Sequence, residues 1–238
     1  MELARYLLIS TVCLSISFII YRLFLGRVYY FQYLRAFLTI SIILSLLLPL
    51  SAIRIDYSVL LGHRPVAAGI NMMTVPYGNI VLSDTHEEGF FASHYVLFTR
   101  LYFAIVFLMC VRIAFQLFRI IRLFFQSEKK KRGKNILLIS SSVKSPFSFF
   151  RLIFLPEDIS DKDEAESIIA HENIHASQYH SFDNLLVELV SAVMWFNPLV
   201  WRMKSSLHMV HEYLADEGAL NTGIDRLRYQ TLLLNHVS

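Results

Sequence analysis

Three long runs of apolar residues occupy the first half of the chain, at about 6–25, 36–53 and 94–118. Most of the charged residues in or beside these runs are single arginines near their ends. A helix needs roughly 20 apolar residues to cross the hydrocarbon core of a bilayer. The pattern therefore predicts three membrane-spanning helices, the last two joined by a loop over 54–90.

The pattern changes from residue 135 onward. Two short apolar runs, 136–140 and 152–155, predict strands that pair as a β-hairpin, with the second strand as a candidate sheet edge. A helix is predicted around His171, followed by a longer apolar helix over 182–202. The uncharged centre of that last helix is short, so it fits either a fourth membrane span or a buried core helix, and we favour the membrane.

Composition agrees with this pattern. The chain is 55% hydrophobic and 17% charged, with a mean hydropathy of +0.48, whereas about 25% charged residues is usual for soluble domains. The net charge of +3 is too small for a nucleic-acid footprint, so no direct nucleic-acid partner is expected. The sequence predicts a mainly α membrane protein with three to four transmembrane helices and a small β-hairpin or sheet.

Basic residues are unevenly distributed between the connections. Seven Lys and Arg residues lie in 119–134, whereas 54–90 has two basic and four acidic residues. Because cytoplasmic loops are enriched in Lys and Arg, the N-terminus and the 54–90 loop are predicted outside. Residues 1–125 then form the membrane region, 126–134 a basic cytoplasmic linker, and 135–238 a domain that begins in the cytoplasm.

The predicted helix around His171 carries the sequence His171-Glu172-Asn173-Ile174-His175. Side chains four residues apart lie on one helical face, so both imidazoles can reach one metal ion. The glutamate beside the first histidine can contact a water rather than the metal. The motif predicts a catalytic Zn²⁺ site with Glu172 as general base; the alternative is a pair of helix histidines that bind no metal.

A catalytic zinc needs three protein ligands and one open position. The metzincin pattern would place Gly at 178 and His at 181, but the chain has Gln178 and Ser181. A carboxylate on a later helix, Glu212, is one candidate, and Asp216 follows it by one turn, where it can orient a ligating histidine. The other candidates for the third ligand are His208, His211 and Asp183.

These motifs resemble the BlaR/MecR-type membrane metallopeptidases over about residues 135–234. The resemblance rests on the zinc motif and on four further stretches: Ser145-Pro146-Phe147, Phe154-Leu155-Pro156, Trp195-Phe196-Asn197-Pro198-Leu199-Val200-Trp201 and Glu212-x-x-Ala215-Asp216. It implies a gluzincin-like zinc domain with Glu212 as third ligand beside His171 and His175, Glu172 as general base, and an active site open to the cytoplasm. Characterised members are antibiotic sensors whose protease leads to loss of a transcriptional repressor. Only 26 residues follow Glu212, so we expect no C-terminal sensor domain here.

The favoured function is an integral-membrane zinc endopeptidase of the bacterial cytoplasmic membrane. Its expected partners are the lipid bilayer, a protein or peptide substrate such as a transcriptional repressor or the chain itself, and a second copy in a homodimer. Two alternatives remain: a non-catalytic membrane sensor or scaffold with a structural or degenerate metal site, and a membrane quality-control protease. Glu172 argues against the scaffold, because a structural site needs no base, and the Trp195–Trp201 stretch favours the signalling family.

Overall fold

The computed structural model describes residues 2–25, 30–52, 90–157 and 162–223, and three long helices dominate its first half. Helix α1 (Glu2–Ile20) continues as the short π-helix η1 (Tyr21–Leu25), and α2 (Phe31–Ala52) and α4 (Phe90–Gln126) follow. Among the described residues, these three helices are long and apolar enough to cross a membrane. The predicted fold class is confirmed, whereas the 54–90 loop lies almost entirely outside the described residues.

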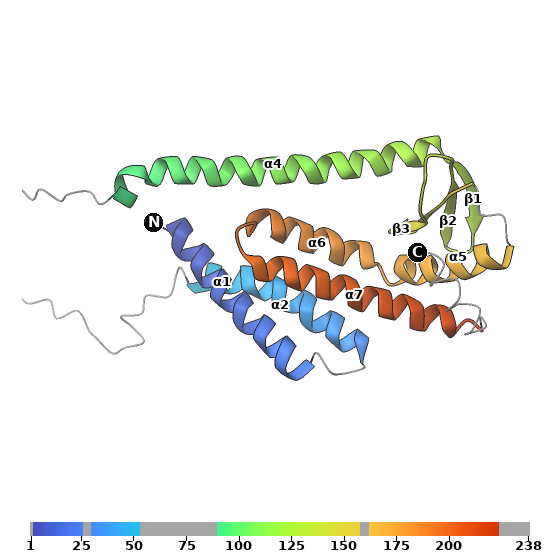
Figure 1. Cartoon of the computed structure of the whole chain (residues 1–238), viewed down its shortest axis with the longest axis horizontal. Helices are drawn as coiled ribbons and strands as arrows, with labels where there is room; N and C mark the ends of the chain where they lie inside the picture. The colour runs from blue at the N-terminus through green and yellow to red at the C-terminus, as the bar shows by residue number, and fades with distance from the viewer. Residues whose placement is uncertain (1, 26–29, 53–89, 158–161, 224–238) are drawn as a thin grey trace, which may run out of the picture.

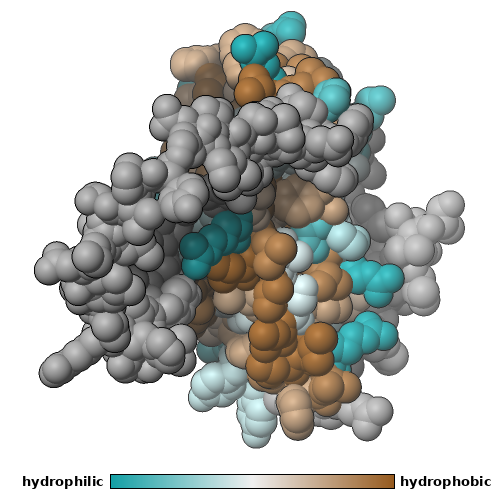
Figure 2. Space-filling model, turned by 90° about the vertical axis from the view of Figure 1, so that its left-hand side faces the viewer, coloured by the Kyte–Doolittle hydropathy of each residue, from teal (hydrophilic) through white to brown (hydrophobic). Residues whose placement is uncertain are grey.

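Large apolar side chains cover the outer surfaces of these three helices. Leu8 is 65% exposed, Leu44 46% and Phe107 67%. Figure 2 shows hydrophobic side chains on the described surface at the end that carries the start of α1. An apolar surface of this extent is unfavourable in water and marks a contact with membrane or protein. Lipid is the natural environment of these helices.

The remaining helices are α5 (Lys162–Ser177), α6 (His180–Val193) and α7 (Pro198–Leu220). Helices α4, α6 and α7 extend roughly along the long axis of the molecule, α1 and α2 lie oblique to it, and α5 lies with a small sheet at one end (Figure 1). The start of α1, the end of α2 and the start of α4 lie at the opposite end. Helix α4 therefore runs along the molecule from that end to the sheet.

The predicted single helix over 182–202 is instead two helices. Helix α6 ends at Val193, and the chain turns before α7 begins at Pro198. The side chain of Asn197 accepts a hydrogen bond of 2.9 Å from the backbone N–H of Leu199, which makes it the N-cap of α7. Proline is favoured at the first helical position, so the Asn-Pro step starts a new helix rather than bending an existing one. Neither α6 nor α7 is among the candidate spans found in the described residues.

One hydrophobic core joins the first two membrane helices to the α6–α7 hairpin. Leu14 on α1 and Leu38 on α2 are fully buried in the same cluster as Met194, beside the hairpin turn, and Leu207 on α7. Helix α4 contacts α6 through a hydrogen bond of 3.0 Å from the Tyr102 hydroxyl to the Val193 carbonyl and an ion pair of 3.4 Å between Arg112 and Glu188. Helix α7, which carries Glu212, is therefore packed directly against membrane helices α1 and α2.

A four-stranded sheet follows α4, with the strands in the order β1-β2-β4-β3. Its strands are β1 (Glu128–Arg132), β2 (Asn135–Ile139), β3 (Phe147–Phe149) and β4 (Leu152–Leu155). The predicted hairpin between 136–140 and 152–155 is wrong, because β2 and β4 pair in parallel. The segment between them contains β3, which forms the antiparallel hairpin with β4 and so takes the place that the prediction gave to β2.

Two related predictions also change. Most of the predicted 126–134 linker is strand β1, which pairs with β2 through a turn at Gly133, where φ of +61° favours glycine. The predicted edge strand Leu152–Leu155 is an inner strand, and the edges are β1 and β3. All of β1 is exposed, and its lysines suit an edge because charge there discourages pairing with other chains.

Helix α7 approaches α5 closely at Gly218. A Cβ atom added at this position would lie 2.7 Å from both Cγ1 and Cδ1 of Ile174 on α5. Real Cβ contacts are not this short, so any side chain at 218 would push the two helices apart or displace Ile174.

We expect Gly218→Val to lower the melting temperature of the purified protein, because overpacking costs about 1–3 kcal/mol. Glu217→Val is the matched control, since Glu217 is exposed on the same helix and receives the same β-branched side chain. Thermal unfolding in detergent, followed by circular dichroism, measures both. Equal melting temperatures for the two variants would contradict close packing at Gly218.

Candidate metal centre

Helix α5 places two histidines side by side, facing α7. His171 and His175 are four residues apart, and their Nε2 atoms are separated by 3.1 Å. From α7, Glu212 places Oε2 3.5 Å from Nε2 of His171 and Oε1 3.7 Å from Nε2 of His175. Three side chains from two helices thus converge on one point.

The separations of these ligand atoms fit a tetrahedral zinc ion. Zinc bonds of about 2.0–2.2 Å at tetrahedral angles separate neighbouring ligand atoms by roughly 3.3–3.5 Å. The three observed separations are 3.1, 3.5 and 3.7 Å. Two imidazoles and one carboxylate are also a donor set of catalytic zinc sites, which keep a fourth position open. The residues present therefore fit Zn²⁺.

The other candidates for the third ligand are placed differently. His211 is fully buried and has its Nε2 3.1 Å from Oδ2 of Asp183, so these two residues bind each other. His208 has its Nδ1 3.5 Å from Oε1 of Glu212, but its side chain is 67% exposed. The geometry favours Glu212 over all three.

Asp216, one turn after Glu212 on α7, contacts the first histidine. Its Oδ1 lies 3.1 Å from Nδ1 of His171. When Nε2 of His171 points to a metal, Nδ1 carries the proton and donates it to this carboxylate. The structure thus brings Asp216 to the position that the sequence spacing predicts, where it would orient the ring of His171.

Glu172 lies in a buried environment next to the ligand cluster. It is 8% exposed, and burial raises the pKa of its carboxyl group above the usual value. The positive charge of His171, together with the polar side chain of Ser148 on the edge strand β3, opposes this rise. Glu172 therefore connects the metal centre to the edge of the sheet.

The protonation states of the ligands differ strongly. Burial lowers the pKa of His171, but hydrogen bonds to Asp216 and Glu212 outweigh it and raise the pKa to about 9. Burial and the charge of His171 lower the pKa of His175 to about 4. The hydrogen bond from His171 lowers the pKa of Glu212. Near neutral pH the metal-free site thus combines a protonated His171, a neutral His175 and an ionised Glu212.

Sequence reasoning missed His180 as part of this site. It follows the end of α5 and is 1% exposed, with its Nδ1 2.7 Å from Nδ1 of His175. Burial and nearby positive charges lower its pKa to about 2, so the ring is neutral. A histidine five residues after the zinc motif was the available indication, but the tight turn at Tyr179 that folds it back, with φ of 56°, is not evident from the sequence.

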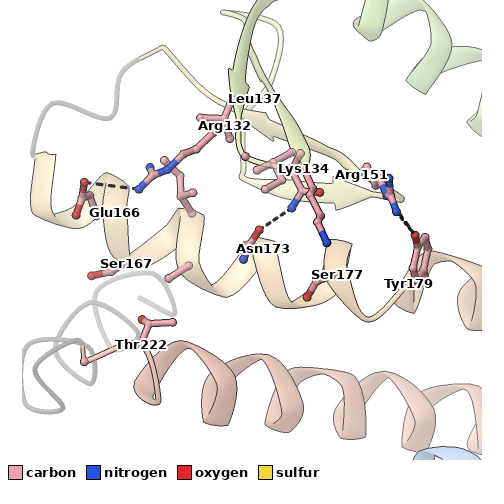
Figure 3. Close-up of a pocket in the computed structure, with 16 residues that line it drawn as sticks. Arg132, Lys134, Leu137, Arg151, Glu166, Ser167, Asn173, Ser177, Tyr179 and Thr222 are labelled. Atoms are coloured by element: carbon pink, nitrogen blue, oxygen red, sulfur yellow. Dashed lines mark hydrogen bonds and ion pairs between the residues drawn. The ribbon is translucent and has the colours of Figure 1, made fainter.

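A separate polar cleft lies on the opposite side of α5, under the sheet (Figure 3). Arg132, Asn173, Arg151 and Tyr179 are among its lining residues, with Arg151 donating a hydrogen bond of 2.7 Å to the Tyr179 hydroxyl. His171, His175 and Glu212 are not among the residues that line this cleft. The metal centre faces α7 instead.

The part of the chain that contains the ligand cluster is similar to known proteins. A family described as BlaR1 peptidase M56 matches residues 99–237, more than half of the sequence. The chain is also 32% identical over 121 residues to "Regulatory protein BlaR1" of Bacillus licheniformis. That similarity covers 48% of this chain and 20% of the relative, so the matched part is about a fifth of the relative's length. The family match includes α5 and α7 and therefore the whole ligand cluster.

We expect Glu212→Ala and His175→Ala to lose bound zinc, because each removes one of three ligands. His208→Ala should keep about one zinc per chain, since His208 contacts Glu212 only from the exposed side. Zinc content of the purified proteins, measured by mass spectrometry, tests the assignment. Retention by Glu212→Ala together with loss by His208→Ala would make His208 the third ligand.

The pKa values also predict how zinc competes with protons. Binding must displace a proton from His171, whose pKa is about 9, and none from His175, whose pKa is about 4. Affinity should therefore rise by about tenfold per pH unit as the pH increases from about 6 towards neutrality. Calorimetry at about pH 6 in buffers of different ionisation enthalpy should detect about one proton released per zinc. Release of two protons would contradict a neutral His175.

Proposed function

This chain belongs to the BlaR1 peptidase M56 family, and we propose that it is an integral-membrane zinc endopeptidase of a regulatory pathway. The observation that supports the proposal is the convergence of His171, His175 and Glu212 beside the buried carboxyl group of Glu172. Ligands alone suffice for a structural metal site. A glutamate in the position of a general base therefore favours catalysis over a non-catalytic scaffold.

Zinc, when bound, would supply a Lewis acid that polarises the scissile carbonyl and lowers the pKa of a water. Glu172 would accept the proton of the attacking water and return it to the leaving amine. Its pKa, raised by burial, lies closer to neutrality, where one carboxyl group can act first as base and then as acid. Asp216 would hold the His171 ring in the required tautomer.

Strand β3 supports an extended polypeptide as the substrate. It is an outer strand of the sheet, and its Ser148 side chain is close enough to Glu172 to lower the pKa of that carboxyl group. The free side of an edge strand can pair with an extended peptide through main-chain hydrogen bonds. A substrate strand bound there would pass close to the general base. The candidates we propose are a transcriptional repressor and a second copy of this chain.

The arrangement of the helices supports a metal centre on the cytoplasmic face of a bacterial membrane. The sheet and α5 lie at the end of the molecule where α4 finishes (Figure 1). Arg119 and Arg122 in the last turns of α4, and the basic strand β1, lie at this end. Basic residues next to membrane spans favour the cytoplasmic side.

Glu172→Gln separates the endopeptidase from the scaffold. We expect this variant to keep its zinc and to lose about 10²–10⁴-fold in cleavage rate, because the base is removed and the ligands are not. Digestion of a peptide library by the protein in lipid nanodiscs, read by mass spectrometry, measures the rate. His208→Ala serves as a control, with activity retained.

If neither the zinc-loaded wild type nor Glu172→Gln cleaves the peptides, the result would support the non-catalytic scaffold. If both proteins cleave at the same measurable rate, Glu172 would be excluded as the general base.

A further inference from the structure

A second polar cluster lies on the Nδ1 side of His175, whereas Glu212 lies on the Nε2 side. We refer to it as the inner polar cluster, and it consists of Arg35, Gln178, His180, Asp183 and His211. The last three of these residues are at most 5% exposed. The proposed reaction uses none of the five, although one of them, His180, contacts the metal ligand His175.

Hydrogen bonds in this cluster run in one direction from the metal ligand. When Nε2 of His175 points to a metal, its Nδ1 carries the proton and donates it over 2.7 Å to Nδ1 of His180. His180 then carries its own proton on Nε2, which lies 3.2 Å from Oε1 of Gln178. Gln178 thus orients the His180 ring, and His180 in turn orients His175.

Arg35 supplies the next contact, and it comes from the first turns of the membrane helix α2. One Nη atom donates to the backbone carbonyl of Gln178 over 2.8 Å, and the other lies 3.5 Å from its side-chain oxygen. Nε donates to Asp183 over 2.6 Å. A single guanidinium therefore holds the end of α5 and the start of α6 together against α2.

Asp183 and His211 fix the remaining face of His180. Asp183 accepts hydrogen bonds from both Arg35 and His211, at 2.6 and 3.1 Å. The His211 ring stacks on the His180 ring, with centroids 4.2 Å apart and planes 9° from parallel. The His180 ring is therefore held through its nitrogen atoms and through its face.

We propose that Arg35 is a positioning residue for the metal ligand His175, acting through Gln178 and His180, so that the placement of membrane helix α2 sets the affinity of the metal centre. The proposal rests on the zinc site of the proposed function. Loss of a hydrogen-bond partner of a ligating histidine typically weakens metal binding by about 10–100-fold. Because coupling between two sites is reciprocal, metal binding would in turn favour the position of α2 in which Arg35 contacts Gln178.

Zinc affinity of the full chain in lipid nanodiscs tests the proposal, measured by competition with a chromophoric chelator. We expect Arg35→Ala and His180→Phe each to bind zinc about 10–100-fold more weakly than wild type. The double variant should bind about as weakly as either single variant, because both changes break the same connection. Arg35→Lys should fall between Arg35→Ala and wild type, because an ammonium group cannot reproduce the two-sided contact of the guanidinium.

Arg112→Ala is the matched control. Arg112 also lies on a membrane helix and binds α6, through an ion pair of 3.4 Å with Glu188, but it lies outside the inner polar cluster. Its removal should leave zinc affinity unchanged. The visible spectrum of the cobalt-substituted protein reports ligand geometry directly, so it should change in Arg35→Ala and His180→Phe and not in Arg112→Ala.

The outcomes separate the two proposals. A wild-type protein that binds no zinc would overturn the zinc site itself. Zinc binding by wild type with unchanged affinity and cobalt spectrum in Arg35→Ala would overturn the positioning role alone. Equal weakening by Arg112→Ala would also overturn it, because the effect would then come from general loosening of the helices.

Discussion

The metal centre depends on the close approach of α5 to α7. Two ligands come from one helix and the third from the other, so their separations of 3.1–3.7 Å require the two helices to lie close together. Gly218 permits this approach, because a side chain at that position would collide with Ile174. Helix α7 is in turn held by a core shared with α1 and α2. The site is thus supported from the membrane side as well as from its own domain.

Local pattern was sufficient to predict the three candidate membrane helices and the helix that carries His171 and His175. Each of these depends on hydropathy over about 20 residues or on the four-residue spacing of one helical face, which neighbouring residues determine. The third ligand was harder to predict. Glu212, His208 and His211 lie within one and a half turns of each other, so their spacing alone does not separate them. Only the position of α5 beside α7 places Glu212 at the histidines and turns His211 towards Asp183.

Features that depend on distant pairing were not predictable from the sequence. The apolar runs at 136–140 and 152–155 correctly indicate strands, but a parallel pair and a hairpin have the same local pattern. The short strand Phe147–Phe149 decides between them by pairing with β4. Similarly, Trp195–Trp201 predicts a continuous apolar helix by hydropathy, whereas the cap at Asn197 and the packing of Met194 against α1 and α2 favour two helices.

The inner polar cluster shows why a membrane helix would be connected to a metal ligand through polar contacts rather than through apolar packing. Leu38 already packs α2 against the α6–α7 hairpin, so attachment alone needs no arginine. A largely buried ion pair such as Arg35 with Asp183 gains little net stability, because desolvation offsets much of the attraction. The contribution of this ion pair is geometric instead. Apolar side chains tolerate small sliding movements between helices, whereas the fixed donor directions of a guanidinium do not. A displacement of α2 would therefore leave the hydrophobic core nearly intact but break the hydrogen bonds that orient His180, and with it His175.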